Sequence, residues 1–208
     1  MSNLEPTSPA NPTPTPDPAP VICMDAAAIA TAIDLMAAEL RALLDSRAIT
    51  APLMVGIHTG GVWVAKRLHA ALGLTDPLGH LDISFYRDDF TRLGLHPQVR
   101  PSHLPVAVDN RHVILVDDVL QTGRTIRAAL NVLFDYGRPR SVILAALAER
   151  DGRQLPIEPN VVGLHMRLEP GEQLKLTGPQ PLVLVRALVP QKPAPHHPEP
   201  PKTREATP

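Results

Sequence analysis

The sequence predicts a single α/β domain built on a doubly wound, mainly parallel β-sheet. Short apolar runs alternate with stretches whose apolar residues recur at helical spacing, which is typical of βαβ units. The chain has 208 residues, 44% of them hydrophobic, so it is long enough to bury one sizeable core. Because only 3% of the residues are aromatic, we expect that core to be aliphatic.

Both ends of the chain are rich in proline. Seven of the 25 prolines lie in residues 1–20 and seven in residues 190–208. Polar segments of this kind have little apolar surface to bury and favour extended conformations, so we expect disordered tails at 1–20 and 191–208. The folded domain is then 21–190. A proline-rich ligand for a partner domain is the less favoured interpretation of the tails.

The first half of the domain is predicted to alternate helices and strands. Residues 25–47 carry apolar side chains at helical spacing behind Asp25 as the N-cap. A short apolar strand is expected at 53–57 and a helix at 62–72, which Gly73 would end. Residues 80–86 alternate between apolar and polar, as in a strand.

The second half continues the same alternation. A buried strand is expected at 112–117, and a helix follows at 125–136. Two further apolar runs, at 141–147 and 160–164, predict strands of the same sheet. The region 165–189 contains two short apolar runs separated by a Gly-Pro pair, which predicts edge strands or a small C-terminal hood.

Residues 113–125, VILVDDVLQTGRT, join a buried strand to a turn that opens a helix. Such a turn places backbone N–H groups and the positive end of the helix dipole at the carboxyl edge of the sheet, where phosphate groups bind. Gly123 lets the backbone approach a ligand closely, while Thr122 and Thr125 add hydroxyl donors. The pattern therefore predicts a phosphate-binding loop.

Two adjacent acids, Asp117 and Asp118, stand at the end of this strand. Carboxylates repel phosphate, but they accept hydrogen bonds from ribose hydroxyls and from hydrated Mg²⁺. The pair thus suits a sugar phosphate better than a free phosphate. An ordinary turn with a helix N-cap is the structural alternative for the same residues.

A second loop of small residues, HTGG at 58–61, lies between a predicted strand and a predicted helix. Its amide groups would again meet at a helix N-terminus, an arrangement suited to pyrophosphate. A plain tight turn is the alternative for the two glycines taken alone.

Several segments together resemble a known family. Residues 113–125 resemble the 5-phosphoribosyl-1-pyrophosphate (PRPP) signature of type I phosphoribosyltransferases. The wider pattern resembles the PyrR family of pyrimidine operon attenuators and uracil phosphoribosyltransferases, and it covers roughly residues 25–165. The segments that carry it, in the order of that family, are GIHTGGVWVAKRL (56–68), LGHLDISFYRDDF (78–90), ILVDDVLQTGRTIRAAL (114–130) and DYGRPRSV (135–142).

The resemblance implies the type I phosphoribosyltransferase fold and the reaction of uracil with PRPP to give UMP and pyrophosphate. A phosphoribosyltransferase for a different base is the alternative. Arg87, Asp117 and Asp118 are then the catalytic residues, and Mg²⁺ is bound with PRPP and through water near the two acids. The PRPP-binding residues implied are Thr59, Gly60, Gly61, Arg87, Asp117, Asp118, Val119, Leu120, Gln121, Thr122, Gly123, Arg124 and Thr125.

Two further expectations come from the resemblance. Backbone groups near Ala148, Glu149 and Arg150, after the 141–147 strand, are expected to meet the base. The family often carries a basic residue where this chain has Gly61, which implies weaker binding of pyrophosphate by that loop.

Residues 87–110 show no periodicity and contain Arg87, Arg92 and Arg100. A long segment of this kind inside a compact domain is usually a functional lid or a disordered insertion. By resemblance, it would close over PRPP and exclude water from an oxocarbenium-like transition state.

The other role of the family is to bind the leader RNA of pyrimidine genes, with UMP or UTP as effectors. Arg138, Arg140 and Arg153 are the candidate RNA contacts. However, residues 21–190 contain 17 basic and 17 acidic side chains, and RNA binding needs a positive surface. We therefore rank catalysis above RNA binding, and keep a mainly RNA-binding attenuator or an inactive relative as alternatives. A homodimer or higher homo-oligomer is expected by resemblance.

The chain has one cysteine, Cys23, so an intramolecular disulfide is excluded and a reducing compartment is favoured. No stretch approaches the ~20 apolar residues of a membrane span. The N-terminus also lacks the basic and apolar regions of a signal peptide. We expect a cytoplasmic protein with no membrane partner.

Overall fold

A computed structural model describes residues 19–83 and 101–188 of the chain. The predicted tails lie outside these ranges except for residues 19–20. Residues 84–100, which include Arg87, Arg92 and Arg100, also lie outside them.

Five parallel strands form the main sheet, in the order β3-β2-β4-β5-β6. The chain moves outward from β2 to β3 on one side, and from β4 through β5 to β6 on the other. The neighbours β2 and β4 therefore flank a topological switch point, where open α/β sheets bind their ligands. The bounds of the strands are Leu53–Ile57 (β2), Gly79–Leu81 (β3), His112–Leu120 (β4), Ser141–Arg150 (β5) and Val161–Met166 (β6).

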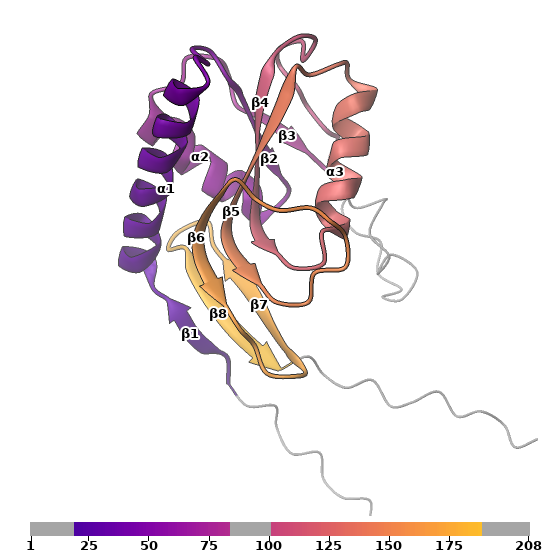
Figure 1. Cartoon of the computed structure of the whole chain (residues 1–208). Coiled ribbons are helices and arrows are strands. Elements are labelled where there is room, and N and C mark those ends of the chain that lie inside the picture. Colours follow the sequence, from indigo (N-terminus) through magenta and orange to yellow (C-terminus); the bar gives the residue numbers. More distant parts are fainter. Residues whose placement is uncertain (1–18, 84–100, 189–208) are drawn as a thin grey trace, which may run out of the picture.

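Helices cover both faces of this sheet (Figure 1). α1 (Ala26–Ser46) and α2 (Gly60–Leu72) lie on one face, and α3 (Arg124–Asp135) lies on the other. Each face has its own cluster of buried side chains, almost all of them aliphatic. The predicted doubly wound α/β fold with an aliphatic core is confirmed.

The first helix begins and packs as its sequence predicts. The Asp25 side chain accepts a hydrogen bond from the backbone N–H of Ala28 at 2.8 Å, which satisfies one of the unpaired donors of the first turn. Ile29 and Leu40, on the predicted apolar stripe, have no exposed surface. Burial of this stripe against the sheet stabilises α1 more than its intrinsic propensity does.

A smaller antiparallel sheet forms a hood at the carboxyl edge of the main sheet (Figure 1). Its order is β1-β8-β7, with β1 at Val21–Met24, β7 at Glu172–Thr177 and β8 at Val183–Leu188. The two strands predicted in 165–189 are confirmed. The hood is not purely C-terminal, however, because β1 pairs with β8 from the other end of the domain. A run of four residues is too short to show strand periodicity.

Two elements next to the site are longer than predicted. β4 continues through the acid pair, because Asp117, Val119 and Leu120 stay paired with the neighbouring strand β5. α2 begins at Gly60, two residues before the predicted start. Glycine has no side chain to contribute to an apolar stripe, so periodicity could not reveal this first turn.

The expectation of a lid over 87–110 is wrong for its second half. Residues 101–110 pack against the body of the domain, and Val108 is completely buried. His80 and His103 exchange two backbone hydrogen bonds, at 2.9 and 2.8 Å. The hydroxyl of Tyr136 donates to the carbonyl of Ser102 at 3.1 Å. These contacts hold residues 101–110 against the body of the domain, so this part does not swing over a ligand. Residues 87–100 lie outside the described ranges.

Candidate active site

A cavity of about 720 Å³ opens at the carboxyl ends of β2 and β4, at the switch point of the sheet. Two loops line it, each of which leads directly into a helix. The loop after β2 is 58–59, followed by the first turn of α2, and the loop after β4 is 121–123, followed by α3. Both loops predicted from the sequence therefore border one cavity, the phosphate cavity.

The loop after β4, the phosphate loop, ends at Gly123, the N-cap of α3. Its φ is 88°, a left-handed conformation that side chains with a Cβ rarely adopt. The hydroxyl of Thr122 accepts a hydrogen bond from the backbone N–H of Arg124 at 3.2 Å. Gly123 offers no side chain to cap α3, so the N–H groups of the first turn receive no cap from that residue.

The acid pair stands between the two loops. Asp117 is only 4% exposed, and one of its carboxylate oxygens accepts the backbone N–H of Asp118 at 3.0 Å. Asp118 also lines the cavity, and its carboxylate lies directly over Gly60, where an added Cβ would overlap it. Two carboxylates thus line a cavity that two helix N-termini also border.

The loop after β2 packs closely on β4. A Cβ at position 61 would lie 2.6 Å from the carbonyl oxygen of Val116 and 3.0 Å from the Cα of Asp117. No side chain fits there unless α2 moves away from the sheet. A basic side chain at 61 therefore has no room in this structure, and the expected weaker binding of pyrophosphate by this loop stays a prediction.

The predicted base-binding residues are divided between different surroundings. Ala148 is fully buried in the core and lines neither of the two cavities. Glu149 faces a second cavity, whereas Arg150 borders both. The guanidinium of Arg150 donates from Nη1 to the carbonyl of Glu172 in the hood at 3.0 Å. Only Arg150 of the three lines the phosphate cavity.

Residues that the sequence patterns do not single out also line the phosphate cavity. Gln173 and Lys175 of the hood strand β7 line it, as does Trp63 of α2, the single tryptophan of the chain. Trp63 also packs close to Gly178, next to the end of β7. Gln173 and Lys175 are more than 100 residues from Trp63 in the sequence, so no local pattern could place these side chains together.

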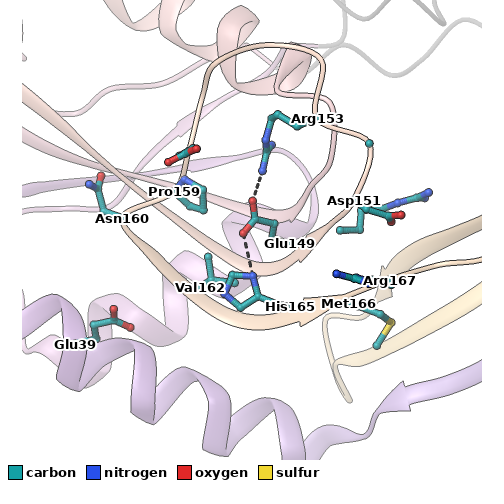
Figure 2. A pocket seen from close by; sticks show the side chains of 13 residues that line it. Glu39, Glu149, Asp151, Arg153, Pro159, Asn160, Val162, His165, Met166 and Arg167 are labelled. Atoms are coloured by element: carbon teal, nitrogen blue, oxygen red, sulfur yellow. Dashed lines mark hydrogen bonds and ion pairs between the residues drawn. The ribbon is translucent and has the colours of Figure 1, made fainter.

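The second cavity, here the side cavity, has a volume of about 800 Å³ and lies beside β5 and β6 (Figure 2). Its walls carry charged side chains of both signs, and some of them pair with one another. Glu149 binds the guanidinium of Arg153 through one carboxylate oxygen and the Nδ1 of His165 through the other, at 3.0 Å (Figure 2). Sequence analysis did not predict this cavity.

The three predicted RNA contacts do not form one patch. Arg138 and Arg140 are exposed just before β5, and Arg153 follows its other end. The ten residues of β5, at 3.3 Å per residue, separate the two places by about 30 Å.

Three histidine rings form a row beside the phosphate cavity. The ring centroids of His58 and His80 are 4.9 Å apart, and those of His80 and His103 are 5.5 Å apart. Burial lowers the pKa of His80 below 6.5, and the positive charges of His103 and Lys66 lower it further.

Among the described residues, no group of three or more His, Cys, Asp or Glu side chains could hold a metal ion. The donors near the phosphate cavity are the two acids, which fit an Mg²⁺ ion held mainly by substrate oxygens and water. None of the described helices has the length and apolar character needed to cross a membrane.

Comparisons with known proteins agree with this geometry. Residues 25–168 match the phosphoribosyl transferase domain family. The bifunctional protein PyrR of Nitrosococcus oceani is 68% identical over 133 residues, which is 63% of this chain and 75% of the relative. The bifunctional protein PyrR of Pseudomonas paraeruginosa is 61% identical over 154 residues, which is 74% of this chain and 91% of the relative.

Solved structures of phosphoribosyltransferases share the fold. The hypoxanthine phosphoribosyltransferase of Trypanosoma cruzi superposes with a TM-score of 0.60 at 18% identity, over 81% of this chain and 97% of that one. A hypoxanthine-guanine-xanthine phosphoribosyltransferase gives 0.56 at 18% identity, over 80% and 93%. At such low identity the likeness concerns the fold alone.

Proposed function

The chain belongs to the PyrR family of phosphoribosyltransferases, and from this premise we propose that it transfers the phosphoribosyl group of PRPP to uracil, giving UMP and pyrophosphate. One observation carries the proposal. Two helix N-termini converge on one cavity, with Asp117 and Asp118 between them. This arrangement offers separate places for two anionic groups and a ribose.

In the proposed complex, the 5′-phosphate of PRPP binds the 121–125 loop and helix start, and the pyrophosphate binds residues 59–61. Asp117 and Asp118 accept hydrogen bonds from the ribose hydroxyls between them. The C1–O bond to pyrophosphate breaks, and N1 of uracil forms the new bond to C1 as its proton passes to the departing pyrophosphate or to water. The amide groups at the start of α2 stabilise the charge that develops on the leaving pyrophosphate.

Mg²⁺ would enter with PRPP and reach Asp117 and Asp118 through water, where it would neutralise the charge of the pyrophosphate. Arg87, which lies outside the described residues, keeps its proposed role beside the same group. Of the residues predicted to meet the base, Arg150 is the best placed, because it lines the phosphate cavity below the hood.

A base panel tests the proposal. The purified chain is incubated with PRPP, Mg²⁺ and, in turn, uracil, orotate, hypoxanthine and guanine, and nucleotide products are separated by chromatography. We expect UMP from uracil and little product from the other bases. Product from another base only would refute uracil as the acceptor, and no product from any base would refute the enzymatic function.

We infer a second, regulatory role as well: binding of a pyrimidine leader RNA that UMP or UTP strengthens. A surface at the end of α3 favours it. Phe134 and Tyr136 are 43% and 46% exposed there, close in sequence to the exposed Arg138 and Arg140. Arginine and exposed aromatic rings together are suited to bind single-stranded RNA.

Gel shifts with leader RNA at two salt concentrations, with and without UMP, test this role. Binding should tighten with UMP and weaken steeply with salt, because arginine–phosphate contacts release counterions. The double change Arg138→Ala, Arg140→Ala should weaken it, and Arg47→Ala, at an exposed arginine just after the end of α1, serves as the control. No binding at low salt would leave the enzyme alone. A homo-oligomer and a cytoplasmic location, the latter based on the lone Cys23, remain proposals beside these roles.

A further inference from the structure

Resting on the proposed function, we propose that Arg153 is a positioning residue for PRPP binding. It lies in the segment 151–157, which follows β5 and does not line the phosphate cavity. Through Arg153, this segment holds the phosphate loop in the conformation that binds the 5′-phosphate.

The segment 151–157 binds two successive carbonyl groups of the phosphate loop. Arg153 donates from Nη1 to the carbonyl of Gln121 at 2.7 Å. The backbone N–H groups of Gln154 and Leu155 both donate to the carbonyl of Thr122 at 3.1 Å. Both carbonyl groups are therefore turned toward the segment.

The direction of these carbonyls sets the direction of the amides. In a planar trans peptide the C=O and N–H bonds point in opposite directions. With the carbonyls of Gln121 and Thr122 held by the segment, the N–H groups of Thr122 and Gly123 point away from it. The phosphate cavity is lined by residues 121–125 but by none of 151–157, which is the arrangement expected if these amides face the cavity.

Arg153 is itself held in place by the main sheet. Its Nη2 pairs with Glu149 of β5, whose second carboxylate oxygen binds Nδ1 of His165 on β6 (Figure 2). The side chains of Arg153 and Glu149 are 24% and 22% exposed, so water competes less for this pair than for a pair on the open surface. The guanidinium thereby connects two sheet strands to the phosphate loop.

Packing fixes the same loop from the same side. A Cβ added at Gly123 would lie 3.3 Å from Cβ of Leu155 and 3.5 Å from Cβ of Ile157, so the segment fits closely against the bare backbone of the glycine. Gln154 accepts a hydrogen bond from Nε of Arg124 at 2.9 Å. The hydrogen bond from Arg153 to the carbonyl of Gln121 is charge-assisted. It comes from a side chain, so a single substitution removes it.

The test compares Arg153→Ala and Arg153→Lys with Arg167→Ala. Arg167 lines the same side cavity and is exposed, so its replacement removes an equal charge from the same wall. PRPP affinity is read from the fluorescence of Trp63, which lines the phosphate cavity. KM values for PRPP and uracil and the melting temperature are measured in parallel.

We expect Arg153→Ala to raise Kd and KM for PRPP about tenfold, as the loss of one charge-assisted hydrogen bond would. KM for uracil and the melting temperature should change little. Arg153→Lys should fall between this variant and the wild type, because an ammonium group cannot bind Gln121 and Glu149 as a fork. Arg167→Ala should bind PRPP like the wild type.

Two results would overturn the proposal: PRPP binding by Arg153→Ala equal to that of the wild type, or an equal loss in Arg167→Ala. If Arg153→Ala does not fold, the Arg153→Lys variant is used in its place. Binding of PRPP by Arg153→Lys with the affinity of the wild type would then also overturn the proposal. A wild-type chain that neither binds PRPP nor forms UMP would instead refute the proposed function.

Discussion

The two cavities at the carboxyl edge of the sheet are similar in size but different in their walls. The phosphate cavity, about 720 Å³, is bordered by two loops that begin helices, together with the acid pair and residues of the hood. The side cavity, about 800 Å³, is bordered by charged side chains, several of which bind one another. If PRPP binds in the phosphate cavity as proposed, backbone donors at helix N-termini matter more for binding a polyanion than the number of charged side chains in the wall.

Neutralising one carboxylate in each cavity is the strongest way to test this difference. Asp118→Asn should lower turnover with PRPP at least tenfold, about 1.4 kcal/mol or more in the barrier, because the carboxylate faces the proposed ribose site. Glu158→Gln, in the wall of the side cavity, is the matched control and should keep nearly full turnover. Near-normal turnover of Asp118→Asn would remove the ribose-binding assignment.

The position of the loop after β4, at the border of a cavity, could be predicted because its information is local. A buried strand, two acids and a Thr-Gly turn follow one another within 113–125. The roles of Trp63, Gln173 and Arg153 could not be predicted in this way. Each depends on a contact between segments far apart in the chain, such as the approach of the hood to α2 or of the 151–157 segment to Gln121.

Some residues are predicted from the sequence to have roles that their positions do not favour. Resemblance makes Gly61 a position where a basic residue is absent, yet the backbone of β4 leaves no room there for a side chain. Arg138 and Arg153 are both basic, which makes both candidate RNA contacts, yet β5 separates them. Composition does not reveal which edge of a sheet a residue occupies.

A second prediction concerns the close packing of α2 on β4. Gly61→Ala should lower the free energy of unfolding by about 2 kcal/mol and weaken PRPP binding, because its Cβ must push the loop away from the sheet. Gly73→Ala, at the other end of α2, has open space around it but a φ of 66°, so it should cost only about 1 kcal/mol and leave binding intact. Urea unfolding and PRPP titration measure both effects.

If the two variants were equally stable and bound PRPP equally well, the close packing at position 61 would have no functional meaning.

The smallest effect is expected in the histidine row beside the phosphate cavity. The pKa of His80 is lowered in the folded chain by burial, and then by His103 and Lys66. The unfolded chain therefore binds this proton more readily, so the free energy of unfolding should fall as the pH drops below 6.5. His80→Gln should show a weaker fall between neutral and mildly acidic pH. Identical pH dependence in both proteins would contradict the lowered pKa.

The central claim is that PRPP binds between the two helix N-termini, and amide hydrogen exchange tests it most directly. With Mg²⁺ and PRPP, exchange should slow in peptides covering 58–62 and 119–126, on both loops of the phosphate cavity. Peptides covering 160–167 on the wall of the side cavity should change little. Protection confined to residues of the side cavity, with none in the two loops, would contradict the account.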